Sequence, residues 1–272
     1  MPTYLLIDNG SKKAAATLAL RKLASNLSEQ TGRIIHPVSL QHADSIDAAE
    51  IDNVPAETFT SFLRYHLQQG EREFIVVPLF FGESRALTSF IPQQTAELEK
   101  EFGNFEVKLA EVIYPLERGE SRLADILYDH IQTISQTDSI ETESIVLVDH
   151  GSPSAKITEV RKRVAKNLQC LLGEKASLAQ AVMERREGGA YDFNGELLVN
   201  WLNAQAEKGV TNVIIAMLFF LPGRHAGECG DIEGICQSVM ARYPKLQISL
   251  TPLISEHKML VSILTDRLDQ LS

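Results

Sequence analysis

The chain has 272 residues, of which 44% are hydrophobic and 23% charged, a composition typical of a soluble globular protein with one or two domains. Its net charge of −10 argues against a broad nucleic-acid surface or a polybasic membrane patch, and its longest apolar run, residues 213–221, is about half of the roughly 20 residues that a transmembrane helix needs. Three cysteines without a CxxC pair, and an N-terminus without a signal-peptide pattern, lead us to expect a cytoplasmic protein.

The first half of the chain alternates between strand and helix patterns. Short apolar runs predict strands at residues 4–8, 34–40, 74–81 and 107–113. Between and after these runs, leucines at three- and four-residue spacing and closing glycines predict helices at residues 14–31, 57–70, 93–102 and 119–134. The run at 74–81 is apolar almost throughout, which is typical of a strand buried on both faces of a parallel sheet.

The second half repeats the same order of elements. Strands are predicted at residues 145–149, 177–183, 213–220 and 248–254, and helices at 157–172, 195–208, a segment ending near Tyr243, and 256–271. An offset of 141 residues pairs Asn9 with His150 and Ser84 with His225. We therefore predict an N-terminal repeat at residues 1–138 and a C-terminal repeat at 139–272, joined by the polar stretch 136–144.

Alternating strands and helices in both halves predict the fold class. We expect an α/β protein of two tandem domains, each a small parallel sheet flanked by helices, with a cleft between them.

His150 and His225 each follow a predicted strand where the apolar run gives way to glycine and polar residues. Ligands of open α/β sheets bind at the carboxyl ends of the strands, and neutral imidazole binds divalent metals and accepts protons near neutral pH. Two unrelated loop histidines that hydrogen-bond locally are the alternative. Because the first half has Asn9 and Ser84 at the matching positions, a packing role shared by both halves does not account for the pair. We predict that both imidazoles face one cavity and bind a metal ion.

Acidic and sulfur-containing residues near these loops are further candidates. Glu184 follows the second strand of the second half and is expected on the same rim, as a third metal ligand or a proton acceptor, or as a solvated surface residue. Glu228 and Cys229 would share a helix face with His225 if a helix began near Arg224. Cys236, seven residues after Cys229, fits a buried helix face better than a metal site.

Four arginines lie on or beside the same loops: Arg85, Arg185, Arg186 and Arg224. In an acidic protein, arginines near a cavity favour a polycarboxylate ligand, which a guanidinium binds bidentately. Ordinary surface arginines paired with neighbouring glutamates are the alternative.

Other catalytic motifs have less support. The segment GESRA places Ser84 after an apolar strand, as in a nucleophile elbow, but Ala86 stands where that motif has glycine. The chain contains neither GxGxxG nor GxxxxGK[ST], so nucleotide binding is not indicated.

A strand that ends in His-Gly-Ser at His150, followed 75 residues later by an apolar strand ending in Gly-x-His and then an acidic-Ile pair, resembles the CbiX family of sirohydrochlorin chelatases, which are relatives of ferrochelatase. The resemblance covers the whole chain as two chelatase-like repeats, of which the second carries the histidine pair. It implies that His150, His225 and Glu184 bind the incoming metal and accept protons from the macrocycle. Under this resemblance Arg85, Arg185 and Arg224 are expected to bind the tetrapyrrole.

The resemblance therefore predicts a metal chelatase, a lyase that inserts a divalent metal into a sirohydrochlorin-like tetrapyrrole in cobalamin or sirohaem biosynthesis. Co²⁺ is slightly favoured over Fe²⁺, and Ni²⁺ and Zn²⁺ stay open. The metal is a substrate, and no organic cofactor, nucleic acid or membrane partner is expected; the protein is expected to be a monomer or a homodimer. The alternative function is a non-catalytic carrier or sensor that binds the metal or the tetrapyrrole.

Overall fold

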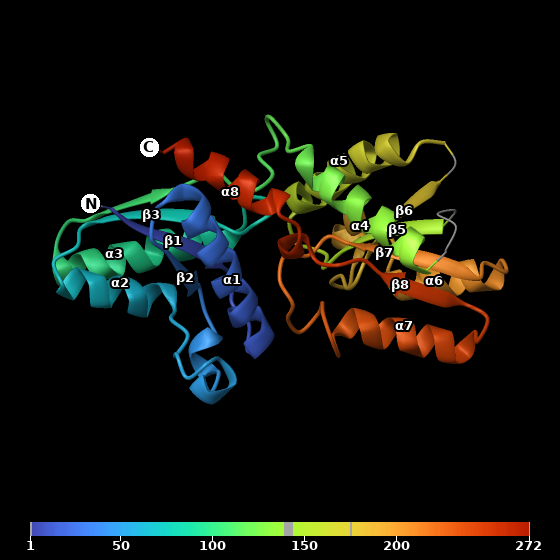
Figure 1. The fold of residues 1–272 in the computed structure, drawn as a ribbon, viewed down its shortest axis with the longest axis horizontal. Helices are drawn as coiled ribbons and strands as arrows, with labels where there is room; N and C mark the ends of the chain where they lie inside the picture. Colours follow the sequence, from blue (N-terminus) through green and yellow to red (C-terminus); the bar gives the residue numbers. More distant parts are fainter. Residues whose placement is uncertain (1, 139–143, 175, 272) are drawn as a thin grey trace. The chain divides into compact units, whose positions relative to one another are not determined.

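The computed structural model describes residues 2–138, 144–174 and 176–271. The chain forms two compact units, one made of Met1–Arg118 and Lys258–Ser272 and the other of Gly119–His257. Each unit contains a four-stranded parallel sheet flanked by helices, which confirms the predicted α/β architecture with two sheets (Figure 1). Within the described residues, none of the helices combines the length and the hydropathy that spanning a bilayer requires.

The sheet of the first unit has the strand order β2-β1-β3-β4. The elements of this unit are β1 (Thr3–Asp8), α1 (Ala14–Thr31), β2 (Ile35–Ser39), the 3₁₀ turns η1 (Ala43–Ser45) and η2 (Ala48–Glu50), α2 (Phe59–Gln68), β3 (Glu73–Pro78), the π-helical turn η3 (Ala86–Phe90), α3 (Ile91–Phe102), β4 (Glu106–Leu109) and α8 (Met259–Asp269). Alternate residues of the central strands, such as Leu5 and Val76, pack with α2 and α3, while α1 and α8 pack against the strands and each other. Because helices pack against them, the central strands are apolar nearly throughout.

The sheet of the second unit has the equivalent order β6-β5-β7-β8. The elements of this unit are α4 (Arg122–Asp138), β5 (Ser144–Asp149), α5 (Ala155–Leu172), β6 (Ser177–Val182), the 3₁₀ turn η4 (Gly189–Asn194), α6 (Leu198–Glu207), β7 (Asn212–Met217), α7 (Asp231–Arg242), β8 (Gln247–Leu250) and the 3₁₀ turn η5 (Ile254–Glu256). Val146 and Ile215 pack in one cluster with α6 and α7, and α4 packs against α5 and β7. The carboxyl ends of the four parallel strands therefore share one edge of the sheet.

The closing helices are exchanged between the repeats. Helix α4 follows the first four strands in sequence but belongs to the second unit, whereas α8 ends the chain and packs beside α1 in the first unit, as the red and blue helices of Figure 1 show. Buried Arg267 on α8 donates hydrogen bonds to the carbonyl oxygens of Val112 and Ile113, both at 3.0 Å. The compact units thus differ in extent from the repeats predicted at 1–138 and 139–272, which remain a prediction about the sequence.

Part of the predicted connection at 136–144 belongs to a helix and a strand. Its first three residues continue α4, its last residue begins β5, and residues 139–143 lie outside the described part of the chain.

The offset of 141 residues, which pairs Ser84 with His225, is wrong for the strands that precede these two residues. The offset of 141 holds for β1 and β5, where Thr3 corresponds to Ser144. Strands β3 and β7 correspond at an offset of 139, because Ile75 and Ile214 pair with residues of β1 and β5 that are themselves 141 apart. The offset returns to 141 at the first buried positions of α3 and α7, Ile91 and Ile232. The loop after β7 is therefore two residues longer than the loop after β3, and Ser84 and His225 are not related by strand register.

Candidate functional site

His150 lies directly after β5, in a turn that only glycine permits. Gly151 has φ +89°, and a Cβ atom there would lie 2.0 Å from the carbonyl oxygen of Glu184. The Glu184 N–H also donates to the His150 carbonyl oxygen at 3.1 Å. This backbone contact holds the residues after β5 and β6 side by side, so that the His150 Nε2 and Glu184 Oε1 atoms are 3.2 Å apart.

The first unit contains the same turn with different side chains. Gly10 also has φ +89°, and its Cβ would lie 1.8 Å from the carbonyl oxygen of Gln41. Asn9 and Gln41 therefore occupy the positions of His150 and Glu184. An imidazole and a carboxylate in the second unit correspond to two neutral amides in the first.

His225 lies in the loop between β7 and α7. Helix α7 begins at Asp231, so the helix considered near Arg224 is absent and the shared helix face of His225, Glu228 and Cys229 was a wrong prediction. The backbone instead turns back on itself: the Ile232 N–H donates to the His225 carbonyl oxygen at 3.1 Å. This return brings the Asp231 carboxylate within 2.7 Å of His225 Nδ1.

The two imidazole rings meet in the second unit. Their centroids are 4.4 Å apart and their planes make an angle of 64°. His150 Nδ1 lies 2.8 Å from the Gly151 carbonyl oxygen, which can only accept a hydrogen bond, and His225 Nδ1 faces the acceptor Asp231. Both Nδ1 atoms are therefore the N–H donors, and each Nε2 atom is left for a proton or a metal.

The contact between Glu184 and His150 has a chemical consequence. With Nδ1 as a donor, the Nε2 atom of His150 faces the Glu184 carboxylate at 3.2 Å, so both atoms can bind a proton or a cation placed between them. The side chains of His150, His225 and Glu184 are 44%, 28% and 59% exposed, which leaves them open to solutes. Among the described residues, however, no group of three His, Cys, Asp or Glu side chains is already arranged to hold a metal ion.

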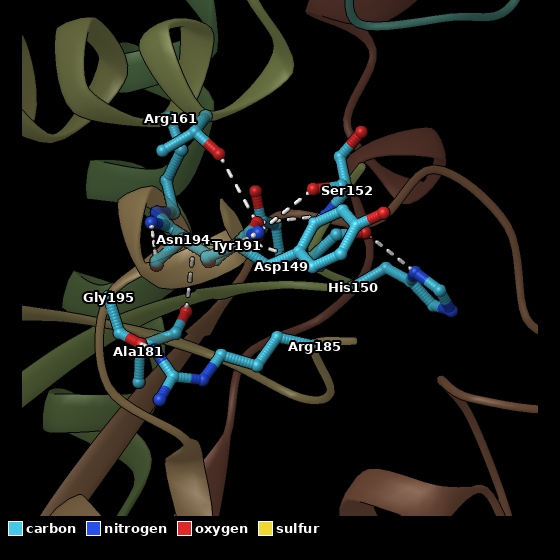
Figure 2. A network of polar contacts seen from close by, with 11 residues as sticks. Asp149, His150, Ser152, Arg161, Ala181, Arg185, Tyr191, Asn194 and Gly195 are labelled. Carbon is cyan, nitrogen blue, oxygen red and sulfur yellow. Dashed lines mark hydrogen bonds and ion pairs between the residues drawn. The ribbon is translucent and has the colours of Figure 1, made fainter. Parts of the chain in front are cut away.

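A buried polar network supports the His150 turn (Figure 2). Asp149, the last residue of β5, accepts hydrogen bonds from Arg161 at 2.7 Å and from the Gly151 N–H at 3.1 Å. Arg161 also donates to the Asn194 carbonyl oxygen at 2.5 Å, and the Asn194 side chain bonds both backbone groups of Ser152 at 2.9 Å. Burial raises the pKa of the Asp149 carboxyl, and Arg161 opposes part of that rise.

The predicted arginines differ in their availability. Arg185 donates to the Gly195 carbonyl oxygen at 3.1 Å and pairs with Asp192 at 3.2 Å, so it already fastens its own loop. Arg224 is 78% exposed and 3.6 Å from Asp231, next to the histidine pair. Arg85 is exposed and lies in the first unit, just before η3.

The cysteines separate into two kinds. Cys236 lies on the buried face of α7, and burial raises the pKa of its thiol to about 12, which does not favour a thiolate ligand. Cys229 is exposed with φ +56°, and its N–H donates to Glu233 at 2.6 Å. Glu228 is exposed in the same loop.

Ser84 lacks the partner that a nucleophile needs. Its Oγ atom is buried without a hydrogen-bond partner within the described part of the chain, so no base is positioned to activate it. The hydrolase alternative therefore has no geometric support.

A family model described as CbiX matches residues 3–133 and again 144–271. The chain belongs to the CbiX family. Among solved structures, SirB from Bacillus subtilis with Fe³⁺ matches with a TM-score of 0.69 and 14% identity, covering 99% of this chain and 95% of that one. The sirohydrochlorin chelatase SirB from Bacillus subtilis subspecies spizizenii in complex with cobalt matches with 0.66 and 15%, again over 99% and 95%.

CbiX described as the terminal enzyme of sirohaem biosynthesis in denitrifying bacteria matches with a TM-score of 0.63 and 13% identity, over 99% of each chain. At these identities the solved structures show a shared fold. No curated protein sequence matches this CbiX-family chain significantly.

Sequence reasoning missed three residues that the structure joins to the site. Asp231 belongs to the acidic-Ile pair, but only the turn from His225 to Ile232 shows that its carboxylate faces the imidazole. For the network of Arg161 and Asn194, the sequence contains one indication: Arg161 corresponds to Leu20, so the second repeat has a charged residue where the first has an apolar one.

Proposed function

We propose that this protein is a sirohydrochlorin chelatase, which inserts a divalent metal ion into a tetrapyrrole, and that its reaction takes place at the carboxyl edge of the second sheet. His150, His225 and Glu184 are the proposed metal ligands and proton acceptors. The single observation that carries the proposal is the pair of imidazoles with both Nδ1 atoms occupied and centroids 4.4 Å apart.

The pair distance is compatible with one shared ion. An ion at about 2 Å from each Nε2 atom lies about 3 Å from each ring centre, so two adjacent ligands of one ion have ring centres about 4.5–5 Å apart. Small side-chain rotations would bring the Glu184 carboxylate to the same ion. An ion with two or three protein ligands keeps open positions, so it can be transferred to the nitrogens of the macrocycle.

The chemistry requires both metal and proton transfer. As M²⁺ enters the ring, two N–H bonds break, two protons leave, and four metal–nitrogen bonds replace the bonds to protein. Once the ion has left them, the imidazoles and Glu184 accept these protons and pass them to solvent. Asp231 keeps the Nε2 atom of His225 directed away from its own carboxylate, and exposed Arg224, which precedes His225 in the chain, is the proposed partner of a substrate carboxylate.

The identity of the metal is a separate part of the proposal. One structural neighbour contains cobalt and another Fe³⁺, and imidazole with carboxylate accepts Co²⁺, Fe²⁺, Ni²⁺ and Zn²⁺. We keep Co²⁺ as slightly favoured over Fe²⁺. Metallation rates with each metal at equal free concentration, under anaerobic conditions for Fe²⁺, measure the preference directly.

The test of the proposal is turnover. Protein at one-fiftieth of the sirohydrochlorin concentration should metallate all of the macrocycle, measured by the change in its absorbance spectrum. His150→Ala with His225→Ala should abolish the acceleration over the uncatalysed rate. The matched control is Asn9→Ala with Ser84→Ala in the first unit, which should retain it.

The competing function has its own signature. A carrier or sensor would bind at most one equivalent of metal or macrocycle and leave the uncatalysed rate unchanged. That result, or full turnover in the double histidine variant, would reject the proposal.

A further inference from the structure

The segment from Arg185 to Gly195 connects β6 to α6 and carries two aromatic residues, Tyr191 and Phe193. Their rings are 6.4 Å apart at the centroids, and both side chains are partly exposed. The corresponding segment of the first unit, residues 40–57, contains no Phe, Tyr or Trp. The aromatic pair is therefore specific to the unit that carries the histidines.

Asn194 fastens this segment to the His150 turn. Its side-chain Nδ2 atom donates to the carbonyl oxygens of both Ser152 and Tyr191, at 2.9 and 3.1 Å. One amide nitrogen thus joins the backbone of Tyr191 to the backbone two residues after His150. Figure 2 shows the Tyr191 ring directed toward the His150 side of this network.

Arg186 gives the aromatic surface a charge. Its guanidinium carbon lies 5.8 Å from the centroid of the Tyr191 ring, within the range of a cation–π contact. Unlike Arg185, which is paired with Asp192, Arg186 has no carboxylate partner in the described part of the chain. A guanidinium stacked on a ring keeps its N–H edge free for a carboxylate.

We propose that Tyr191 and Arg186 form the recognition surface of the second unit for a planar, carboxylate-bearing macrocycle, with Tyr191 stacking on the ring and Arg186 binding one carboxylate. This inference rests on the proposed function, because it names residues that select its substrate. Asn194 is a positioning residue in this arrangement: it fixes the distance between the ring surface and the histidine pair.

The experiment is a titration of metal-free sirohydrochlorin, followed by its absorbance, in which no metal transfer takes place. Tyr191→Ala should raise the Kd at least fivefold, whereas Tyr191→Phe, which keeps the flat ring, should stay within twofold of wild type. Tyr65→Ala, which removes an exposed tyrosine from α2 of the first unit, is the matched control and should also stay within twofold. Affinity for Co²⁺ alone, measured by equilibrium dialysis, should be the same in Tyr191→Ala and wild type.

Arg186 is tested by removing charge from either partner. Arg186→Ala should weaken binding of the free acid and reduce the dependence of Kd on salt, but it should leave binding of the methyl ester of the macrocycle unchanged. If Tyr191→Ala lowers the Tm, Tyr191→Leu preserves apolar bulk without a flat face and should still raise the Kd.

Two results would overturn the inference, and they are distinguishable from failure of the proposed function. If wild-type protein binds and metallates the macrocycle while Tyr191→Ala and Tyr191→Leu bind it as tightly, only the recognition surface is rejected. If Arg186→Ala weakens the acid and the ester equally, the carboxylate contact is rejected. If wild-type protein neither binds nor metallates the macrocycle, the proposed function fails and this inference with it.

Discussion

The turn glycines of the two units allow a test in which one substitution is made at two equivalent backbone positions. In Gly151→Ala the new Cβ would lie 2.0 Å from the Glu184 carbonyl oxygen, and in Gly10→Ala 1.8 Å from that of Gln41, so each neighbouring backbone must move by about 1 Å to reach the 3.0 Å that such contacts require. An L-residue in the left-handed region costs about 1–2 kcal/mol, and displacing packed backbone costs about 1–3 kcal/mol. Each variant should therefore lose about 2–5 kcal/mol of stability.

The assays separate the shared loss of stability from the loss of metal binding. For a unit of about 140 residues, such a loss corresponds to a fall in Tm of roughly 5–15 °C by calorimetry. Only Gly151→Ala should also weaken Co²⁺ binding, by about tenfold or more, because it moves Glu184 away from its 3.2 Å contact with His150. Equal metal affinity in the two variants, whether retained or lost, would refute the reasoning that this turn builds the metal site.

Four further predictions follow from particular contacts and from burial. Asp231→Asn should weaken Co²⁺ binding by about 10- to 100-fold, since an amide does not fix the tautomer of His225, and Asp44→Asn in the first unit is the control that should leave affinity unchanged. Burial raises the pKa of Asp8, whose Oδ1 atom is buried without a hydrogen-bond partner within the described residues. The cost of burying the charged carboxylate is present above the raised pKa and disappears as the pH falls below the ordinary pKa. Asp8→Asn should therefore raise the Tm at pH 8 and lose that gain near pH 4. Asp149→Asn should do the opposite at pH 8 and cost about 3–5 kcal/mol, because it leaves buried Arg161 without its carboxylate; stabilisation by Asp149→Asn would contradict the pairing. In the native protein Cys170 and Cys229 should react with a thiol reagent at pH 8 while Cys236 does not, and rapid labelling of all three thiols would contradict the burial of Cys236.

The contrast between Asp8 and Asp149 illustrates how the repeats diverged. Arg161 fills the space beside Asp149, but the equivalent position on α1 is Leu20, so Asp8 is not paired with a buried arginine in the part of the chain that the structure describes. Arg21, which follows Leu20, instead donates hydrogen bonds to the carbonyl oxygens of Ile51 and Val54 and does not bond Asp8. The first unit thus keeps the shape of the turn and its aspartate but lacks the arginine, the histidine and the glutamate of the second unit.

Much of the candidate site was predictable because it depends on local pattern. His150 and His225 each follow an apolar run, and in parallel sheets such positions share an edge, so the sequence predicts that the two residues lie close together. Asp231 was not predictable in its role, because its contact depends on the loop turning back between His225 and Ile232. The assumed helix near Arg224 failed for the same reason: the chain turns at Gly227 and Cys229, which have φ +99° and +56°, before α7 begins at Asp231.

The sequence by itself determined the alternation of strands and helices, the two parallel sheets and the repeat, since apolar periodicity is a local property that each segment expresses wherever it packs. Only the tertiary structure decided which sheet each closing helix covers, because α4 and α8 have similar apolar faces and the choice depends on contacts such as those of Arg267 with Val112 and Ile113. It also decided the register of β7 and the partners of His225 and Asp149, since a loop's path and a buried ion pair depend on residues distant in the chain.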